Sequence, residues 1–367
     1  MIFYEVFVFL VSLFGCLLLV ATRRWHEGLT GDAHGGVQNM HSEPALRIGG
    51  VAIYLGLACA WYFARGGVAG LIGTLLVAGL PAFFFGLLED LSNRIGIRLR
   101  LLATAASGVI ACLMSGASLS GLDVWGLDPL LQWLPLSIAF TAFAIAGVAN
   151  AFNVIDGLNG LSSGTMTLVS LGLAGIALAV GDLALAKVCL LLGGVVLGFL
   201  VVNLLTGKIF LGDGGAYFTG FALAWLAVLL VERNDAVSPF AVLLIFIKPV
   251  FEVLFSIFRR VIRGHSPTHA DRLHFHSLFV RRYLRRWLAG ASPRVVNSIG
   301  GFLLALLTLP PVIFAQQFYA RTDLCLVAIV VLVLGYLSLY ARMVRHHWCS
   351  PIAFILEKPA LRRRRYA

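Results

Sequence analysis

The sequence predicts an all-α, polytopic integral membrane protein with about eleven transmembrane helices, and its composition is the first reason. Of 367 residues, 60% are hydrophobic and only 12% are charged, and the mean hydropathy is +0.93. Soluble proteins are about half apolar and about a quarter charged, so this chain has too few polar side chains to cover a water-exposed surface. Because a bilayer-spanning helix needs about 20 apolar residues, the apolar content suffices for about eleven spans. A soluble fold, collagen and a disordered chain are excluded.

Apolar runs separated by turns and charges place the expected spans. Their centres lie near residues 11, 57, 78, 110, 142, 171, 194, 223, 248, 308 and 332. The first run has no basic segment before it and ends in Ala21-Thr22-Arg23-Arg24 rather than in a cleavage site, so we expect a retained span and not a signal peptide. Residues 1–367 are therefore expected to form a single transmembrane domain, in which 259–298 is a long basic cytoplasmic loop.

The net charge of +11 is explained by membrane topology. Nucleic-acid binding would need a basic patch on a soluble surface, and no nucleic-acid partner is expected. About 23 of the 28 Lys and Arg residues fall in alternate breaks and in the C-terminal tail, and the positive-inside rule assigns these to the cytoplasm. The N-terminus is then periplasmic and the C-terminus cytoplasmic. The six cysteines form no CxxC pair, so neither a disulfide framework nor a zinc site is indicated.

Acidic residues are scarce, and several lie at the predicted cytoplasmic ends of spans. Glu89 and Asp90 end the third span, Asp156 ends the fifth, and Asp213 precedes the eighth. Two adjacent carboxylates at the negative end of a helix dipole are unfavourable, and a bound cation would remove the penalty. Mg²⁺ is commonly held by a few carboxylates and a substrate phosphate. A simple helix stop is the alternative interpretation of the acid pair.

Amides and glycines accompany these acids. Asn150, Asn153, Asp156 and Asn159 follow one another at steps of three, which places them on one side of a helix end. An asparagine such as Asn150 can equally serve as a helix-packing hydrogen bond in a membrane. The functional interpretation of the stretch depends on the acid in the same register.

A second acid is bracketed by glycines. Gly212 and Gly214 flank Asp213, and such a segment allows backbone amides to surround a phosphate while the carboxylate holds a metal. A flexible turn is the alternative. Arg100, which follows the acid pair, either contacts phosphates or anchors the fourth span.

The most specific motif lies in the long basic loop. His269, Asp271, Arg272, His274 and His276 fall within eight residues. No further Cys or His pattern completes a zinc site, and histidine and arginine donors suit a diphosphate. A solvated loop with incidental histidines is the alternative.

These clusters, in this order, resemble the polyprenyl-phosphate N-acetylhexosamine-1-phosphate transferase superfamily, glycosyltransferase family 4. The family includes the initiating transferases of O-antigen, enterobacterial common antigen and teichoic acid synthesis. The resemblance covers roughly residues 40 to 285. The sequence departs from the usual pattern with Glu89 for the first Asp of a pair, Asn159 for a second Asp, Ser277 for a second His and Thr104 for Gln.

The resemblance implies a Mg²⁺-dependent phosphotransferase, with Mn²⁺ as the alternative ion. The enzyme would transfer N-acetylhexosamine-1-phosphate from a UDP-sugar such as UDP-GlcNAc to undecaprenyl phosphate and release UMP. That step would initiate a cell-surface polysaccharide such as the O-antigen of lipopolysaccharide. The implied location is the bacterial inner membrane with the active site on the cytoplasmic face, and a homodimer is compatible with it.

The resemblance also implies roles for individual residues. Asp213 is expected to bind the metal together with Asp156, which is also a candidate catalytic residue. Asp90 is expected to deprotonate or orient the lipid phosphate, supported by Glu89. Asn153 would orient uridine or the metal shell. The other expected substrate-binding residues are Asn150, Asn159, Arg100, His269, Asp271, Arg272, His274, His276, Gly212 and Gly214, with Arg272 and the last two histidines on the donor phosphates.

Two other classes remain as alternatives. A secondary transporter should bind its substrate near the membrane midplane between internal repeats. Here the acids cluster at span ends and no repeat is found, which favours the transferase. A non-catalytic relative of the transferases is kept open by the departures at Glu89 and Ser277.

Overall fold

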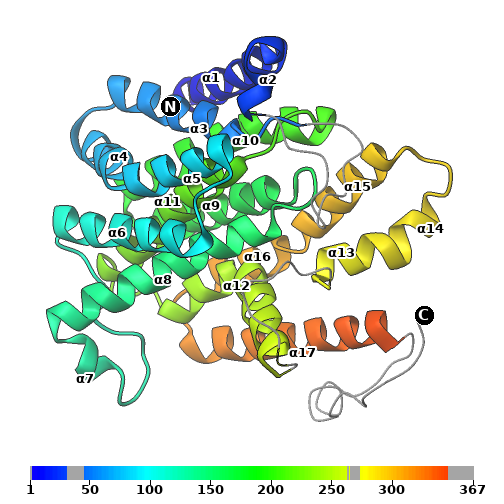
Figure 1. The fold of residues 1–367 in the computed structure, drawn as a ribbon. Coiled ribbons are helices and arrows are strands. Elements are labelled where there is room, and N and C mark those ends of the chain that lie inside the picture. The colour runs from blue at the N-terminus through cyan, green and yellow to red at the C-terminus, as the bar shows by residue number, and fades with distance from the viewer. Residues whose placement is uncertain (1, 31–44, 263, 265–272, 346–367) are drawn as a thin grey trace.

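The computed structural model of the chain is a bundle of helices (Figure 1), and it describes residues 2–30, 45–262, 264 and 273–345. In these ranges the only β-type pairing is an isolated bridge between Leu46 and Ile209. The expected all-α membrane fold is confirmed. The helices are α1 (Ile2–Ala21), α2 (Arg23–Thr30), α3 (Gly49–Phe63), α4 (Gly66–Ala78), α5 (Leu80–Ser92), α6 (Ile97–Ser115), α7 (Asp128–Leu131), α8 (Leu134–Ile155), α9 (Leu161–Ala179), α10 (Leu183–Thr206), α11 (Gly212–Glu232), α12 (Pro239–Ile262), α13 (Phe275–Phe279), the π-helical turn η1 (Val280–Leu284), α14 (Arg285–Trp287), α15 (Pro293–Leu306), α16 (Leu309–Gln317) and α17 (Thr322–Arg345).

The observed spans correspond to the apolar runs of the sequence. Among the described residues, nine helical segments are long and apolar enough to cross a membrane, with 293–317 counted as one of them. The pair α4 and α5 forms a tenth, bent by 45°, and the apolar helix α3 is shorter, at 15 residues. Each expected centre falls in one of these elements.

The third span is broken where the sequence predicted continuity. Helix α4 ends at Ala78 and α5 begins at Leu80, with Pro81 in its first turn. Proline lacks the N–H that would continue the preceding helix, and its ring clashes with the carbonyl four residues earlier. The break therefore redirects α5 and with it Asp90 at its far end.

The predicted loop 259–298 is bounded more narrowly by helices. Helix α12 continues through Ile262, and α15 begins at Pro293. Between them, residues 275–287 are helical, as α13, η1 and α14.

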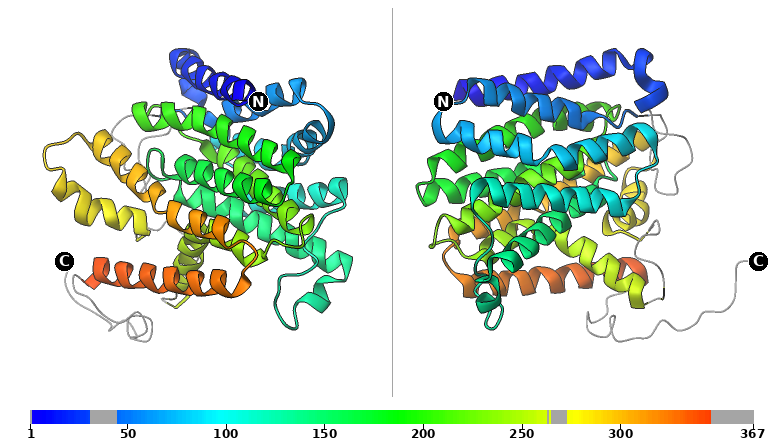
Figure 2. Two further views of the ribbon diagram at one scale, coloured as in Figure 1. Left: turned by 180° about the vertical axis from the view of Figure 1, so that it is seen from behind. Right: turned by 60° about the vertical axis from the view of Figure 1, so that its left-hand side comes forward.

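Helix α11 forms the centre of the bundle. All of its residues from Gly212 to Leu230 are buried, and it packs against α3, α5, α6, α8 and α9. In Figures 1 and 2, α1 and α17 lie at opposite edges and α11 lies between them. Small residues permit this packing, since a Cβ on Gly220 would lie 2.6 Å from the Cα of Ala149 in α8. Close backbone approach at small residues is how membrane helices commonly associate.

The two ends of α11 belong to different polar regions. Its first turn carries Asp213, and its last residue, Glu232, accepts hydrogen bonds from the backbone N–H and the hydroxyl of Ser120 at 2.8 and 2.9 Å. Since 21 residues of α-helix span about 30 Å, the segments that the charge pattern assigns to opposite sides of a membrane lie at opposite ends of this helix.

We expect Gly220→Ala to destabilise the protein by about 1–3 kcal/mol, because the added methyl would overlap the backbone of α8. Thermal unfolding in detergent measures the loss. The matched control is Gly147→Ala in α8, where an added Cβ meets no atom within 4 Å. Equal melting temperatures for the two variants would contradict the close packing of α8 on α11.

Candidate active site

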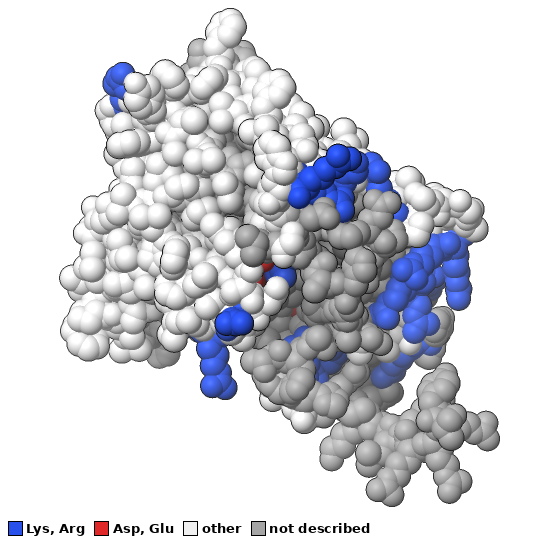
Figure 3. Space-filling view, turned by 45° about the horizontal axis from the view of Figure 1, so that its top comes forward, with Lys and Arg blue, Asp and Glu red and all other residues white. Residues whose placement is uncertain are grey.

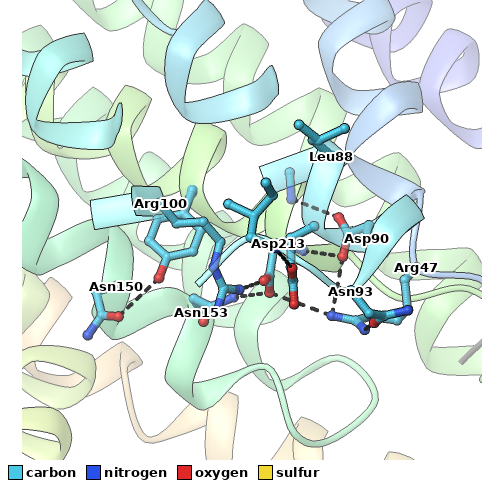
Figure 4. A network of polar contacts seen from close by, with 12 residues as sticks. Arg47, Leu88, Asp90, Asn93, Arg100, Asn150, Asn153 and Asp213 are labelled. Carbon is cyan, nitrogen blue, oxygen red and sulfur yellow. Dashed lines mark hydrogen bonds and ion pairs between the residues drawn. The ribbon is translucent and has the colours of Figure 1, made fainter. Parts of the chain in front are cut away.

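Asp90 joins the end of α5 to the beginning of α11. Its Oδ1 accepts the N–H of Asp213 and its Oδ2 accepts the N–H of Gly214, both at 2.9 Å (Figure 4). The approach is close because a Cβ on Gly86 would lie 2.6 Å from the Cα of Gly214. A carboxylate at a helix N-terminus is favoured by the unpaired N–H groups and the dipole there. Asp90 is 3% exposed, so this buried carboxylate stabilises the contact between α5 and α11 as well as belonging to the polar cluster.

Asp213 is the point where the cluster converges. The side-chain amide of Asn153 donates to its Oδ1 at 2.7 Å, and the guanidinium of Arg100 forms an ion pair with its Oδ2. These residues come from α8, α6 and α11, which the sequence separates by up to 113 positions from Arg100 to Asp213. The structure thus brings together three of the residues that the motifs singled out.

Arg47, to which the sequence analysis assigned no role, lies between two acids. Its Nη2 is 3.3 Å from Asp90 Oδ1 and 3.9 Å from Asp213 Oδ1, and its Nη1 donates to Asn93 Oδ1 at 3.3 Å. Its side chain is 24% exposed, so the guanidinium borders the surface as well as the acids. No spacing within the sequence relates it to Asp90, which is 43 positions away.

The backbone holds Arg47 in this place. Leu46 donates its N–H to the carbonyl of Lys208 at 3.0 Å and accepts the N–H of Phe210 at 2.7 Å. The segment before α3 is thereby paired with the segment before α11. The start of two helices and the acid of a third meet at one end of the bundle.

An aromatic contact supports Arg100. Its guanidinium carbon lies 5.8 Å from the centre of the Tyr217 ring, within the range of a cation–π interaction. The Tyr217 hydroxyl donates to Asn150 Oδ1 at 3.2 Å. Asn150 therefore reaches Asp213 through Tyr217 and Arg100 rather than by direct contact.

Asp156 ends α8 at the same end of the bundle. Burial raises the pKa of its carboxyl to about 7, and the positive charge of Arg47 partly offsets the rise. A cation bound there would favour the charged form of the carboxyl.

Glu89 and Asn159 have other contacts. The Glu89 carboxylate accepts the N–H of Ile95, in the turn before α6, at 2.6 Å. The backbone N–H of Asn159 donates to Asn297 Oδ1 at 2.7 Å, and its side-chain amide donates to Ser298 Oγ at 3.1 Å. Asn159 is 1% exposed and fastens the turn after α8 to α15.

His274 and His276 face a buried acid. His276 Nδ1 is 2.8 Å and His274 Nδ1 is 4.0 Å from Oε1 of Glu252 in α12, and the two rings stack with centroids 5.3 Å apart. The Nε2 of His276 is 3.0 Å from where a Cβ on Gly157 would lie, so the histidines adjoin the turn after Asp156. The sequence contained a signal for Glu252, since an acid inside a predicted span is by default a candidate functional residue. His269, Asp271 and Arg272 lie outside the described residues.

Basic side chains are exposed on one face of the molecule. On the face drawn in Figure 3, most Lys and Arg atoms of the described residues lie on the right-hand side, and a few acidic atoms are visible in a recess beside a basic side chain. Such a surface attracts anionic ligands.

The donor set fits Mg²⁺ in one particular mode. Within the described ranges, no three His, Cys, Asp or Glu side chains are grouped as an all-protein metal cage. Mg²⁺ is usually bound by one or two carboxylates together with waters and substrate phosphates. Asp213 and Asp156 can supply carboxylates for an ion that a phosphate substrate shares.

We expect Asp90→Ala to lower the stability of the protein by about 1–3 kcal/mol, because the buried N–H groups of Asp213 and Gly214 would lose their acceptor. Thermal unfolding in detergent is the measurement. Glu89→Ala is the neighbouring control with a smaller expected loss, since Glu89 accepts one N–H at a partly exposed turn. An Asp90→Ala protein as stable as the wild type would refute the capping role.

Comparison with known proteins gives consistent matches. Residues 72–231 match the model of glycosyl transferase family 4. Over 241 residues the chain is 30% identical to undecaprenyl-phosphate alpha-N-acetylglucosaminyl 1-phosphate transferase of Yersinia pestis and 29% identical to that of Escherichia coli K12. A probable enzyme of this kind from Bacillus subtilis is 27% identical over 241 residues.

The matched segment covers 64–65% of this chain and 65–66% of these relatives, just under two thirds of their length. Residues 72–231, which match the family model, include α5, α6, α8 and all of α11 but its last residue, and these helices supply Asp90, Arg100, Asn153 and Asp213. By these matches the chain is similar to glycosyl transferase family 4 and to undecaprenyl-phosphate N-acetylglucosaminyl 1-phosphate transferases.

Proposed function

We propose that the protein transfers N-acetylhexosamine-1-phosphate from a UDP-sugar to undecaprenyl phosphate and releases UMP. The observation that carries this proposal is the convergence of Asp90 and Asp213 with Arg47 and Arg100 at one end of the bundle. The names of the relatives describe transfer of N-acetylglucosamine 1-phosphate to undecaprenyl phosphate, which supports the same reaction here.

In the proposed reaction an oxygen of the lipid phosphate attacks the β-phosphorus of the UDP-sugar. A new P–O bond forms there, the bond from the β-phosphorus to the bridging oxygen breaks, and UMP leaves with that oxygen and its electron pair. Enzymes promote such transfers mainly by positioning the phosphates and neutralising their charge. The products are UMP and a polyprenyl-diphospho-sugar.

The two arginines are the proposed phosphate-binding groups. Arg47 and Arg100 contact carboxylates in the structure, and the donor diphosphate would compete with those carboxylates for the guanidinium groups. Bidentate hydrogen bonds to phosphate suit arginine in particular. His274 and His276 adjoin the same region through Gly157 and are proposed to contribute to donor binding.

Each acid then has a distinct proposed role. Mg²⁺ held by Asp213 and Asp156 would neutralise charge on the diphosphate when bound. Both oxygens of Asp90 accept backbone N–H groups of α11, so we assign to Asp90 the orientation of Asp213 and of Arg47. Asn153 holds Asp213 Oδ1 from the side of α8.

The proposed location is the bacterial inner membrane, with the cluster at the cytoplasmic face. The lipid substrate reaches this end of the bundle from the bilayer and the nucleotide from the cytoplasm. The proposed pathway step is initiation of a surface polysaccharide such as O-antigen.

The defining experiment is UMP release by the purified, detergent-solubilised protein. We expect release that requires undecaprenyl phosphate, one member of a panel of UDP-N-acetylhexosamines and Mg²⁺, and that EDTA abolishes. Release without the lipid, or no release with any donor from folded protein, would overturn the proposal.

Asp213→Asn is expected to reduce UMP release at least 100-fold, because the amide neither binds a divalent cation as a carboxylate does nor pairs with Arg100. The control is Asp235→Asn, which removes an exposed carboxylate from the turn between α11 and α12. Equal turnover of the Asp213→Asn protein and the wild type would refute the assignment.

A further inference from the structure

Glu252 is a buried acid within a helix long and apolar enough to span the membrane. It lies in α12 and is 3% exposed. A carboxylate in such a place is costly unless other groups pair with it, and such residues are commonly functional. Lys248, one turn earlier on α12, is also within the span and has its Nζ 3.3 Å from Thr165 Oγ1.

The partners of Glu252 are the two histidines. Oε1 of Glu252 is within hydrogen-bond distance of His276 Nδ1, at 2.8 Å, and is 4.0 Å from His274 Nδ1. The rings are nearly parallel, with an interplanar angle of 6°. His276 and His274 are 5% and 7% exposed, so one buried carboxylate oxygen faces both imidazoles.

The backbone is fixed immediately before this pair. The carbonyl of Leu273 accepts hydrogen bonds from Arg259 at 2.7 Å and from the Tyr340 hydroxyl at 3.1 Å. Phe275 stacks on Tyr336 of α17 at 4.9 Å. Because these contacts fix the backbone at Leu273 and the ring of Phe275, they also restrict the positions from which the His274 and His276 side chains extend.

The second nitrogen of His276 faces the candidate active site. When the Nδ1–H donates a hydrogen bond to the carboxylate, the other ring nitrogen, Nε2, lies on the far side of the imidazole. That nitrogen lies beside Gly157, where a Cβ would be 3.0 Å away, and Gly157 follows Asp156 directly. The Glu252–His276 pair therefore links α12 to the turn that follows α8.

We propose that Glu252 is a positioning residue that holds His276 with its Nδ1 protonated and its Nε2 directed at the Asp156–Gly157 turn. The catalytic consequence rests on the proposed function. There, a fixed His276 presents Nε2 toward the donor phosphates, much as outer partners orient histidines in other sites. Glu252 itself does not contact substrate.

The kinetic test is a double-mutant cycle on UMP release. Glu252→Gln keeps the size of the side chain and removes the charge, and we expect the KM for the UDP-sugar to rise about tenfold, which corresponds to about 1.4 kcal/mol. The KM for undecaprenyl phosphate should not change. In a His276→Ala background, Glu252→Gln should have no further effect on the donor KM, because the residue acts through the histidine.

The control is Glu5→Gln, which removes another carboxylate from a spanning helix, where Glu5 pairs with Lys187. Its donor KM should equal that of the wild type. If Glu252→Gln does not fold, Glu252→Asp is the replacement test. Its side chain is shorter by one methylene, so the carboxylate lies farther from His276, and the donor KM should rise as well. An unchanged donor KM in a folded Glu252 variant, or an equal rise with and without His276, would overturn the proposal.

A spectroscopic readout separates this proposal from the proposed reaction. In protein labelled with ¹⁵N-histidine, the His276 signals are assigned by their loss in His276→Ala. We expect a protonated Nδ1 in the wild type and a shift of the proton toward Nε2 in Glu252→Gln. An unprotonated Nδ1 in the wild type would refute the Glu252–His276 pairing whether or not UMP is released. Absence of UMP release with this signature intact would refute only the reaction.

Discussion

The hydrogen bonds from the first turn of α11 to Asp90 are the interaction on which the site depends. Helix α11 is buried along almost its whole length, so its position determines where the helices around it can lie. Its N-terminal N–H groups have no partner within the helix, and a non-polar surrounding offers none. The Asp90 carboxylate satisfies two of them. The same contact places Asp213 against Arg100 and Arg47, so the end of the bundle and the polar cluster form together.

This dependence explains the small residues around the contact. Gly86 and Gly214 leave the α5 and α11 backbones too close for a Cβ on either. A side chain there would move Asp90 away from the N–H groups it accepts. The break between α4 and α5 at Gly79 also helps to place Asp90, because it allows α5 a direction different from that of α4. Packing and polar geometry are therefore determined by the same few positions.

The sequence predicted the helices well because each membrane span is a contiguous apolar segment of sufficient length, which can be recognised without knowledge of the tertiary structure. It also located the acids at helix ends, and Asp90, Asn153, Arg100 and Asp213 do meet. It did not find Arg47, whose partner Asp90 is distant in the chain, and its pattern gave no reason to separate Asn159 from Asn153. Helical register alone placed both on one side, but the helix ends at Ile155. Beyond that residue a spacing of three no longer places side chains on the same face, and Asn159 hydrogen-bonds to residues of α15 instead.

Charge balance links the cluster to the proposed substrates. The acids Asp90 and Asp213 are matched by Arg47 and Arg100, two carboxyl groups against two guanidinium groups. A donor diphosphate and a lipid phosphate would add several negative charges to a partly buried region, where repulsion is weakly screened. Arginines released from the carboxylates would neutralise the phosphates but would uncover Asp213. A divalent cation held by Asp213 would offset both imbalances, and for this reason we expect the proposed reaction to require Mg²⁺, although the described residues form no all-protein metal cage.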